Sequence, residues 1–581
     1  MTDVILDDRL DAADDLTSEV LRNALVVAAE EASIVVVRSA YSTFVVEGSD
    51  ASAALLDKTG RLIAHSMATT LMNSMALSVA VPFLLEDIPA SEMRPGDVFA
   101  TNDAYKGGVH TNDILIFRPI FVAGVVEYFA ATLIHVSDIG GASAGGMASL
   151  ATEIFSEGLQ LPPVLIATAA GLERPIMEIL ALNSRTPEKV KGDVRALIAG
   201  ASTAARRVEE LIDTYGAAGF SDGVTAYLDY TETLTRKAVA ELPAGTYVAD
   251  YTIDDDGVTD IRGHRVQVTV TIDGDGVRLD FTGTDGQVAA AVNSSISQSL
   301  AAAVFAFRCF IDPEIPMNDG CLRVLDVHLP LGSLLNAEAP YPCGGRFLPA
   351  YAAMEAVLTA LSDAVPERAI AASGILQPFS IAATTAPYWV HLAYEFGGVG
   401  ARYGKDGPDA TGIHFGLGRN SVPQVEPVET RCPLLVEGVE YIPDSGGPGK
   451  WRGGLGTRTT FKLLADAYIT TRGDRLAMGP RGRDGGMPGV TGAFLRRTVD
   501  GETIRLASKV SNHFFAAGDR FIVETSGGGG IGDPSTRSRD DIAADHRSGR
   551  ITKEGARRDY DVVIDDSGEI VSGAGNAAPP A

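Results

Sequence analysis

The sequence predicts a multidomain α+β protein in which a mixed helix–sheet, metal-bearing region precedes a β-rich region with many glycine loops. Its 581 residues exceed what one hydrophobic core usually holds. The first half alternates amphipathic helical patterns with short apolar strand patterns, and the last third places short strand patterns between glycine clusters. We expect five parts: a helix and hairpin metal-site region at 1–165, a helical segment at 166–244, a mixed α/β region at 245–390, a β-rich glycine-loop region at 391–537 and a loosely attached tail at 538–581.

Composition and charge exclude several classes of protein. With 45% hydrophobic and 21% charged residues, the chain has the composition of a soluble globular protein. Its net charge of −27 argues against a nucleic-acid binder, which needs a basic surface. Four cysteines without a CxxC pair indicate a reducing compartment. The acidic first residues lack the basic and apolar regions of a signal peptide, and charges interrupt the apolar stretch 24–46, so we expect a cytoplasmic protein.

Apolar spacing predicts the order of helices and strands along the chain. In the first hundred residues we expect a helix at 16–41, strands at 49–56 and 62–65, a helix at 73–86 kinked or shortened at Pro82, and a strand at 98–101. Beyond the central stretch we expect helices at 177–215 (divided near 186–188), 221–242, 298–310 and 348–361, with strands from 245 between them. The short strands after about residue 390 indicate a sheet sandwich or barrel-like region.

The stretch from residue 102 to residue 141 carries four candidate metal ligands, His110, Asp113, His135 and Asp138. Two apolar strands are expected at 114–121 and 126–134, with a tight turn at 123–124. Antiparallel pairing about that turn places Asp113 opposite His135, on one face and roughly 5 Å apart at Cβ. His110 lies three residues before Asp113 in a glycine-containing loop. This is the geometry of a metal site, although histidines at strand ends also occur as structural residues.

A His/His/Asp set suits several divalent metals. Zinc is our first expectation for this site, and manganese and iron are the alternatives. The following glycine-rich loop at 140–147, GGASAGGM, lacks the Lys-Ser/Thr of a Walker A loop and does not match GxGxxG. We expect it to act as a flexible active-site loop against the hairpin. No nucleotide-binding motif appears in the chain, so any use of ATP would require a partner subunit.

Several long motifs resemble the hydantoinase B family. They are GDVFATNDAYKGGVHTNDILIFRPIF, HVSDIGG and TEIFSEGLQLPPV, followed in the same order by IPMNDGCLRVLDV, DSGGPGKWRGGLG, GDRLAMGPRGRDGGMPG and SGGGGIGDP. That family includes second subunits of ATP-dependent N-methylhydantoinases, the C-terminal half of 5-oxoprolinase, caprolactamase, and subunits of acetone and acetophenone carboxylases. The resemblance covers nearly the whole chain.

The resemblance implies a metal-bearing subunit that works with a hydantoinase A-type, ATP-binding partner. The partner would phosphorylate the substrate, and this chain would receive the activated species at its metal. The ligand set that it implies is Asp50, His110, Asp113 and His135. Asp138 then takes a supporting role. Asp138 or Asp103 would orient a ligand histidine or take a proton.

The chain departs from the family pattern in two segments. The stretch 67–75, MATTLMNSM, replaces a segment that carries a histidine in many relatives, and Ala104 stands where proline is usual. The first change predicts a pocket wall with more apolar and hydroxyl groups, which places the familiar hydantoin and oxoproline substrates in doubt. We expect an ATP-dependent cyclic amide (lactam or hydantoin-type) hydrolase subunit. The alternatives are a subunit of an ATP-dependent ketone carboxylase and a structural subunit clamped by its metal.

Overall fold

A seven-stranded antiparallel sheet forms the framework of the N-terminal region. The computed structural model describes residues 12–48, 51–66, 71–412, 422 and 424–573. The strand order is β2-β1-β5-β4-β3-β6-β7, with every neighbouring pair antiparallel. The strands are β1 (Ala51–Asp57), β2 (Leu62–His65), β3 (Val98–Thr101), β4 (Asp113–Val122), β5 (Val125–His135), β6 (Val164–Thr168) and β7 (Gly171–Leu172).

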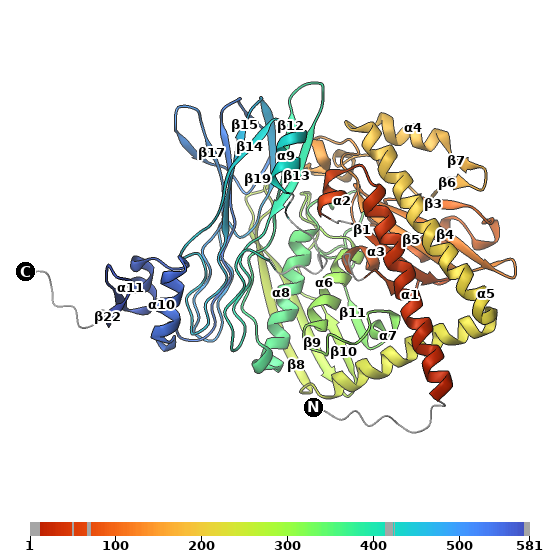
Figure 1. The fold of residues 1–581 in the computed structure, drawn as a ribbon, viewed down its shortest axis with the longest axis horizontal. Coiled ribbons are helices and arrows are strands. Elements are labelled where there is room, and N and C mark those ends of the chain that lie inside the picture. Colours follow the sequence, from red (N-terminus) through yellow and green to blue (C-terminus); the bar gives the residue numbers. More distant parts are fainter. Residues whose placement is uncertain (1–11, 49–50, 67–70, 413–421, 423, 574–581) are drawn as a thin grey trace, which may run out of the picture.

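Helices cover both faces of this sheet (Figure 1). Along β4, Ile114 and Ile116 pack toward α1 (Ala12–Ser39) and α5 (Pro187–Ala240), which lie on one face. The alternate residues Leu115 and Phe117 pack toward the other face. That face is covered by α3 (Leu71–Asp87), α6 (Ile296–Arg308) and α8 (Phe347–Ala364). Because successive strand side chains point to opposite faces, burial on both sides explains why β4 is an almost continuous apolar run.

A second sheet packs against the far side of α8. It contains β8 (Gly245–Asp255), β9 (Arg262–Asp273), β10 (Gly276–Asp280) and β11 (Leu325–His328) in the order β11-β10-β9-β8. The pairs β8–β9 and β9–β10 are antiparallel, and β10–β11 is parallel. Its apolar side chains join those of α6 and α8 in the largest hydrophobic cluster. The layers are therefore helix, sheet, helix and sheet.

The C-terminal region is a sandwich of two sheets. One has the order β13-β12-β16-β19, and the other β14-β15-β20-β17-β18. Phe379, Phe461 and Phe521 meet in the cluster that both sheets share, which confirms the sandwich and not the barrel. The strands are β12 (Gln377–Ala383), β13 (Val390–Glu395), β14 (Leu434–Tyr441), β15 (Thr457–Leu463), β16 (Ala467–Arg472), β17 (Ala493–Arg497), β18 (Thr503–Arg505), β19 (Lys509–Phe515) and β20 (Arg520–Glu524).

Glycine-rich segments form a further layer next to the sandwich. These extended segments run side by side in Figure 1 and are joined by backbone hydrogen bonds between distant parts of the chain. The Gly528 N–H donates to the Gly454 carbonyl at 2.9 Å, and the Gly454 N–H donates to the Val399 carbonyl at 2.8 Å. A Cβ atom at Gly453 would overlap the carbonyl oxygen of Gly528. The backbones approach this closely because glycine has no side chain.

The remaining helices follow the sequence expectation in part. Pro82 lies inside α3 and does not end it. The expected division near 186–188 is present, because α4 (Arg174–Leu182) ends before α5 begins at Pro187. From there α5 runs through the expected second helix to Ala240, with non-helical backbone only at Gly216. The short helices are α2 (Thr43–Gly48), α7 (Asp319–Leu322) and α9 (Val425–Arg431).

Most of the segment expected as a loosely attached tail is folded. It contains α10 (Arg539–Arg547), α11 (Lys553–Tyr560), β21 (Val562–Ile564) and β22 (Ile570–Gly573), which enclose a small hydrophobic cluster. Asp545 accepts hydrogen bonds from Arg537 Nη2 at 2.7 Å and from Arg452 Nε at 3.3 Å. These buried ion pairs attach the unit to the glycine-rich layer. No helix in the described part of the chain combines the length and apolar character needed to cross a membrane.

The glycine layer leads to a first prediction. We expect Gly453→Ala to lower the free energy of unfolding by about 3 kcal/mol, because the backbone of Gly528 and Gly529 leaves no room for a methyl group. The urea midpoint measures the effect. Gly438→Ala in β14 is the matched control, because its Cβ would meet nothing closer than 3.8 Å. Equal midpoints for the two variants would contradict this account of the layer.

Candidate metal centre

The β4–β5 hairpin brings Asp113 and His135 together, as the sequence predicts. The two residues are direct partners in the antiparallel register. The connecting turn has positive φ at both Ala123 (50°) and Gly124 (83°), which is the backbone form of the favoured two-residue hairpin. A register irregularity between Ile120 and Phe121 absorbs one residue next to the turn without changing the pairing at the far end.

His110 is placed by the loop that precedes β4. Asn102, which is fully buried, donates from its amide to the carbonyls of Thr111 and Leu159 and accepts from the Leu161 N–H. At Gly107, φ is 86° and a Cβ would lie 2.5 Å from the backbone of Ala80 in α3. The loop is therefore held on both sides. Its end closes with the Asp113 N–H donating to the His110 carbonyl at 2.9 Å.

Three donor groups converge at this end of the sheet. His110 Nε2 lies 3.0 Å from His135 Nδ1 and 3.3 Å from Asp113 Oδ2, and His135 Nδ1 lies 3.3 Å from Asp113 Oδ1. All three residues are buried, and one ligand atom from each falls within 4.8 Å of the others. Burial, and after it the nearby guanidinium groups of Arg346 and Arg472, hold the pKa of His110 well below its usual range. A buried neutral imidazole beside a carboxylate fits a divalent metal.

Among the described residues, the structure gives no hydrogen bond or ion pair from Asp103 or Asp138 to His110 or His135. Asp50 lies outside the described residues. Asp138 is buried and accepts from the N–H groups of Gly140, Gly145 and Arg185 and from the Arg185 guanidinium, so it holds the glycine-rich loop. The Asp103 carboxylate accepts from the Tyr105 N–H at 2.9 Å. The hydrogen bonds and ion pairs found for Asp103 and Asp138 therefore go to the chain around them and not to His110 or His135.

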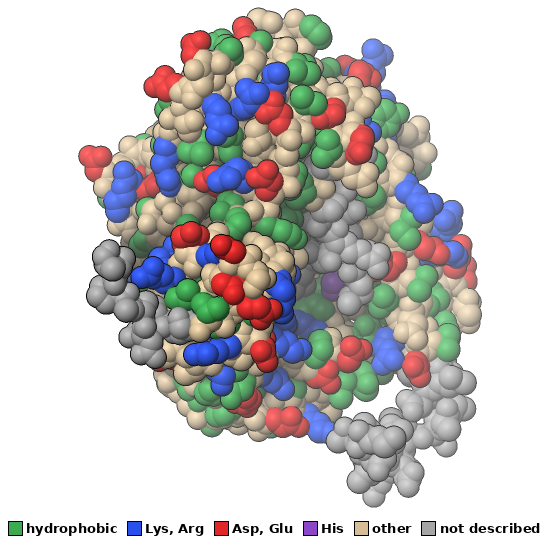
Figure 2. All heavy atoms as spheres, turned by 60° about the vertical axis from the view of Figure 1, so that its left-hand side comes forward, with side chains coloured by type: hydrophobic (Ala, Val, Ile, Leu, Met, Phe, Trp, Pro, Cys, Tyr) green, Lys and Arg blue, Asp and Glu red, His purple; other side chains and the backbone are tan. Residues whose placement is uncertain are grey.

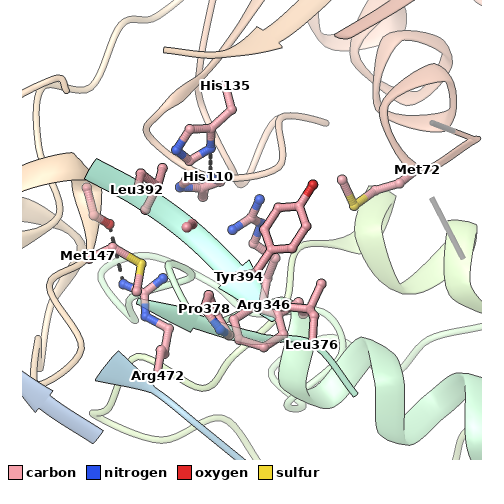
Figure 3. Close-up of a pocket in the computed structure, with 13 residues that line it drawn as sticks. Met72, His110, His135, Met147, Arg346, Leu376, Pro378, Leu392, Tyr394 and Arg472 are labelled. Atoms are coloured by element: carbon pink, nitrogen blue, oxygen red, sulfur yellow. Dashed lines mark hydrogen bonds between the residues drawn. The ribbon is translucent and has the colours of Figure 1, made fainter. Parts of the chain in front are cut away.

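A cavity opens beside the donor cluster, between the N-terminal sheet and the C-terminal sandwich (Figure 3). A histidine side chain is visible in a hollow of the molecular surface in Figure 2. One end of the cavity is polar, and the rest of its wall is largely apolar. It is lined by Met72, His110, His135, Gly146, Met147, Arg346, Phe347, Leu376, Pro378, Leu392, Ala393, Tyr394 and Arg472.

Sequence reasoning missed two arginines in this wall. Arg346 immediately precedes α8, and its Nη2 lies 3.3 Å from Asp113 Oδ2. Arg472 ends β16 and donates to the carbonyls of Gly344 and Gly146. The glycine pair at 344–345 was a usable signal for Arg346, because it marks a close backbone approach. An arginine at the end of a strand carries no comparable signal.

Glu157 links the arginines to the loop before α8. Its carboxylate accepts from the Gly344 N–H at 2.6 Å and from the Cys343 N–H at 3.1 Å. Burial raises the pKa of Glu157 to about 7, although Arg472 and the two N–H groups oppose this shift. Glu157 thus fixes the loop that carries Arg346. Glu157 can be located in the sequence within the motif TEIFSEG, but its hydrogen bonds to the loop before α8 cannot be predicted from the sequence.

A buried His/His/Asp cluster beside an open cavity is the form that the active site of a metal-dependent enzyme takes. The chain belongs to the Hydantoinase B/oxoprolinase family, whose model matches residues 14–534. This confirms the resemblance drawn from the sequence motifs.

Individual relatives match over almost their whole length. The chain is 30% identical to a putative D-/L-hydantoinase component of Pseudomonas sp. (strain NS671), over 96% of each chain. It is 28% identical to the beta chain of the caprolactamase of Pseudomonas jessenii, over 98% of this chain and 99% of that protein. The crystal structure of the ATP-dependent caprolactamase from P. jessenii superposes with a TM-score of 0.87, at 26% identity over 97% and 98% of the two chains.

A nucleotide-free acetone carboxylase structure also shares the fold. Its TM-score is 0.85, at 20% identity over 96% of this chain and 81% of that chain. At that identity the likeness shows the fold alone. Both sequence relatives above are named as subunits of larger enzymes.

The pKa of Glu157 leads to a prediction of pH dependence. The native state keeps the Glu157 proton up to about pH 7, whereas an unfolded glutamate loses it near 4.5. The stability that this group contributes is therefore present below pH 4.5 and lost as the pH rises through about 7. Relative to Glu157→Gln, wild-type protein should lose up to about 3 kcal/mol of stability over this window.

Thermal midpoints of chelator-treated protein at pH 5 and pH 8 measure this difference. The exposed Glu502→Gln is the control and should follow the pH dependence of the wild type. A constant gap between wild type and Glu157→Gln at the two pH values would show that Glu157 ionises normally in the folded protein.

Proposed function

We propose that this chain is the metal-dependent subunit of an ATP-dependent enzyme that opens cyclic amides. Its substrate would first be phosphorylated by a hydantoinase A-type partner, which binds the ATP. The names of its relatives, hydantoinase, caprolactamase and 5-oxoprolinase, support this class of reaction. The observation that carries the proposal is the His110–Asp113–His135 cluster in the wall of the cavity.

Activation of the substrate explains why ATP is needed. An unstrained amide is a poor electrophile, and transfer of a phosphoryl group to the amide oxygen makes the adjacent carbon more reactive. Water would add to that carbon, the ring C–N bond would break as the nitrogen takes a proton and leaves, and a second water would hydrolyse the resulting acyl phosphate to the carboxylate and phosphate. Held by His110, Asp113 and His135, a divalent metal would supply an activated water at neutral pH. Zinc is the metal we propose first, and manganese and iron are the alternatives.

The residues of this chain would hold the metal and the substrate around it. His110, Asp113 and His135 are proposed as ligands of the metal, and Asp50 is proposed as a fourth. Asp103 and Asp138 are proposed to orient a ligand histidine or to take a proton. Asp138 would act on the site indirectly. It accepts a hydrogen bond from the Gly145 N–H at 3.0 Å and so positions the loop that contributes Gly146 and Met147 to the cavity.

The apolar part of the cavity supports a substrate with a hydrocarbon ring or chain. The side chains of Phe347, Leu376 and Leu392 offer no hydrogen bonds, so a hydantoin or 5-oxoproline would leave polar groups unpaired against them. A simple lactam fits this wall better. The same wall also suits a ketone, and for this reason carboxylation of a phosphorylated enol is the second candidate. A closed structural metal site is disfavoured by the open cavity next to the ligands.

Turnover by the assembled enzyme distinguishes these candidates. The chain is co-expressed with a hydantoinase A-type partner and tested for ATP consumption with lactams, hydantoins and ketones, each with labelled bicarbonate. We expect ATP-dependent ring opening of a lactam without incorporation of the label. Label in a β-keto acid product would instead establish the carboxylase.

Metal content of the same preparations tests the ligand assignment. We expect His110→Ala and His135→Ala to lose both the metal and at least about 100-fold in turnover, because the nucleophile depends on the metal. Exposed His328→Ala on β11 is the control and should retain both. A histidine variant that loses its metal but keeps full activity would overturn the catalytic role and support the structural alternative.

A further inference from the structure

Arg472 is a buried cation with no carboxylate within ion-pair distance among the described residues, and Glu157 stabilises its charge only from further away. The residue is 1% exposed, yet it lines the cavity. Its guanidinium donates to the carbonyls of Gly344 and Gly146, and its buried Nε has no hydrogen-bond partner in the part of the chain that the structure describes. The Arg472 guanidinium, a group that usually pairs with an anion, is therefore hydrogen-bonded within the described chain only to two neutral carbonyls.

Such a cation is costly to keep in a folded protein. Burial lowers the pKa of Arg472 to about 10, so the guanidinium still carries its charge at neutral pH. A buried charge without a partner is strongly unfavourable, and a chain with a net charge of −27 has many carboxylates that could have paired with it. Buried charges that lack an ion-pair partner are expected at functional sites.

A second cation faces the same cavity. The Arg346 guanidinium lies against Asp113, and its charge contributes to lowering the pKa of Arg472, so the two side chains repel each other. Both arginines lie below the two imidazoles in Figure 3. Glu157 is the acidic group next to them, but its oxygens accept from the N–H groups of Cys343 and Gly344. The described residues that line the cavity therefore include two arginines and no carboxylate.

We propose that Arg472 and Arg346 form a subsite for the phosphoryl group of the activated substrate. This assignment rests on the proposed function and deepens it. A guanidinium presents parallel N–H groups that match two oxygens of a phosphate, and the dianion supplies the missing countercharge. The subsite lies beside the donor cluster, so it admits the phosphorylated amide in preference to the free amide. Arg472 would thereby set the order of the two half-reactions.

Inorganic phosphate is the probe for this subsite. Its binding to the full chain is measured by calorimetry, without partner, ATP or cyclic amide, on chelator-treated and on zinc-loaded protein. We expect saturable binding to both forms, weakened about 10- to 100-fold by Arg472→Met. Arg472→Lys keeps the charge but loses the paired N–H groups, and it should show an intermediate loss. Acetate at equal ionic strength should not compete.

Arg475→Lys is the matched control. Arg475 is also buried and lies three residues further along, but it stacks on the Tyr251 ring at 3.9 Å and does not line the cavity. It should bind phosphate as the wild type does. If Arg472→Met does not fold, as judged by circular dichroism, the comparison of the two lysine variants decides the question.

Three results would overturn the subsite. They are no phosphate binding to the chelated wild type, equal binding by both Arg472 variants and the wild type, or displacement of phosphate by acetate, which would indicate a carboxylate site. None of these depends on turnover, so each leaves the proposed function standing. Conversely, label incorporation in the turnover assay would refute the hydrolase without affecting the phosphate titration.

Discussion

Antiparallel pairing between β4 and β5 holds Asp113 and His135 at adjacent positions, and most of the N-terminal region serves to keep that pairing in place. Both faces of the hairpin are covered, by α1 and α5 on one side and by α3, α6 and α8 on the other. Two converging imidazoles and a carboxylate are unfavourable neighbours when they are buried without a ligand. The apolar contacts of the sheet hold them in that arrangement.

The cavity needs the C-terminal sandwich as much as it needs the hairpin. β12, β13 and β16 contribute Pro378, Leu392, Tyr394 and Arg472, while the loop before α8 contributes Arg346. Gly344, between these walls, has no space for a side chain. A Cβ there would lie 2.5 Å from Glu157 Oε1 and 2.9 Å from Arg472 Nη2. The site is therefore formed at the interface between the N-terminal region and the C-terminal sandwich, and both regions contribute residues to it.

The sequence was most informative where local patterns decide the structure. The hairpin register followed from the turn at 123–124 and the apolar runs on both sides, and the ligand cluster followed from the register. Arg346 and Arg472 could not be found in the same way, because they reach the cavity through contacts between segments far apart in the chain. The folding of residues 539–573 was also missed, since Asp545 is bound by Arg452 and Arg537, whose spacing carries no periodic signal.

The glycine layer also constrains how the molecule can be made. The Gly398 N–H donates to the Ser526 carbonyl, and the Gly529 N–H donates to the Ala372 carbonyl, so each inner segment is completed by one synthesised much later. Closing such long loops costs entropy before any contact repays it, which slows folding. During synthesis, the backbone groups of the segment at 372–400 lack these hydrogen-bond partners until residues 526–529 leave the ribosome. During that interval its unpaired backbone groups are available to other chains, so we expect aggregation during synthesis to begin at this segment.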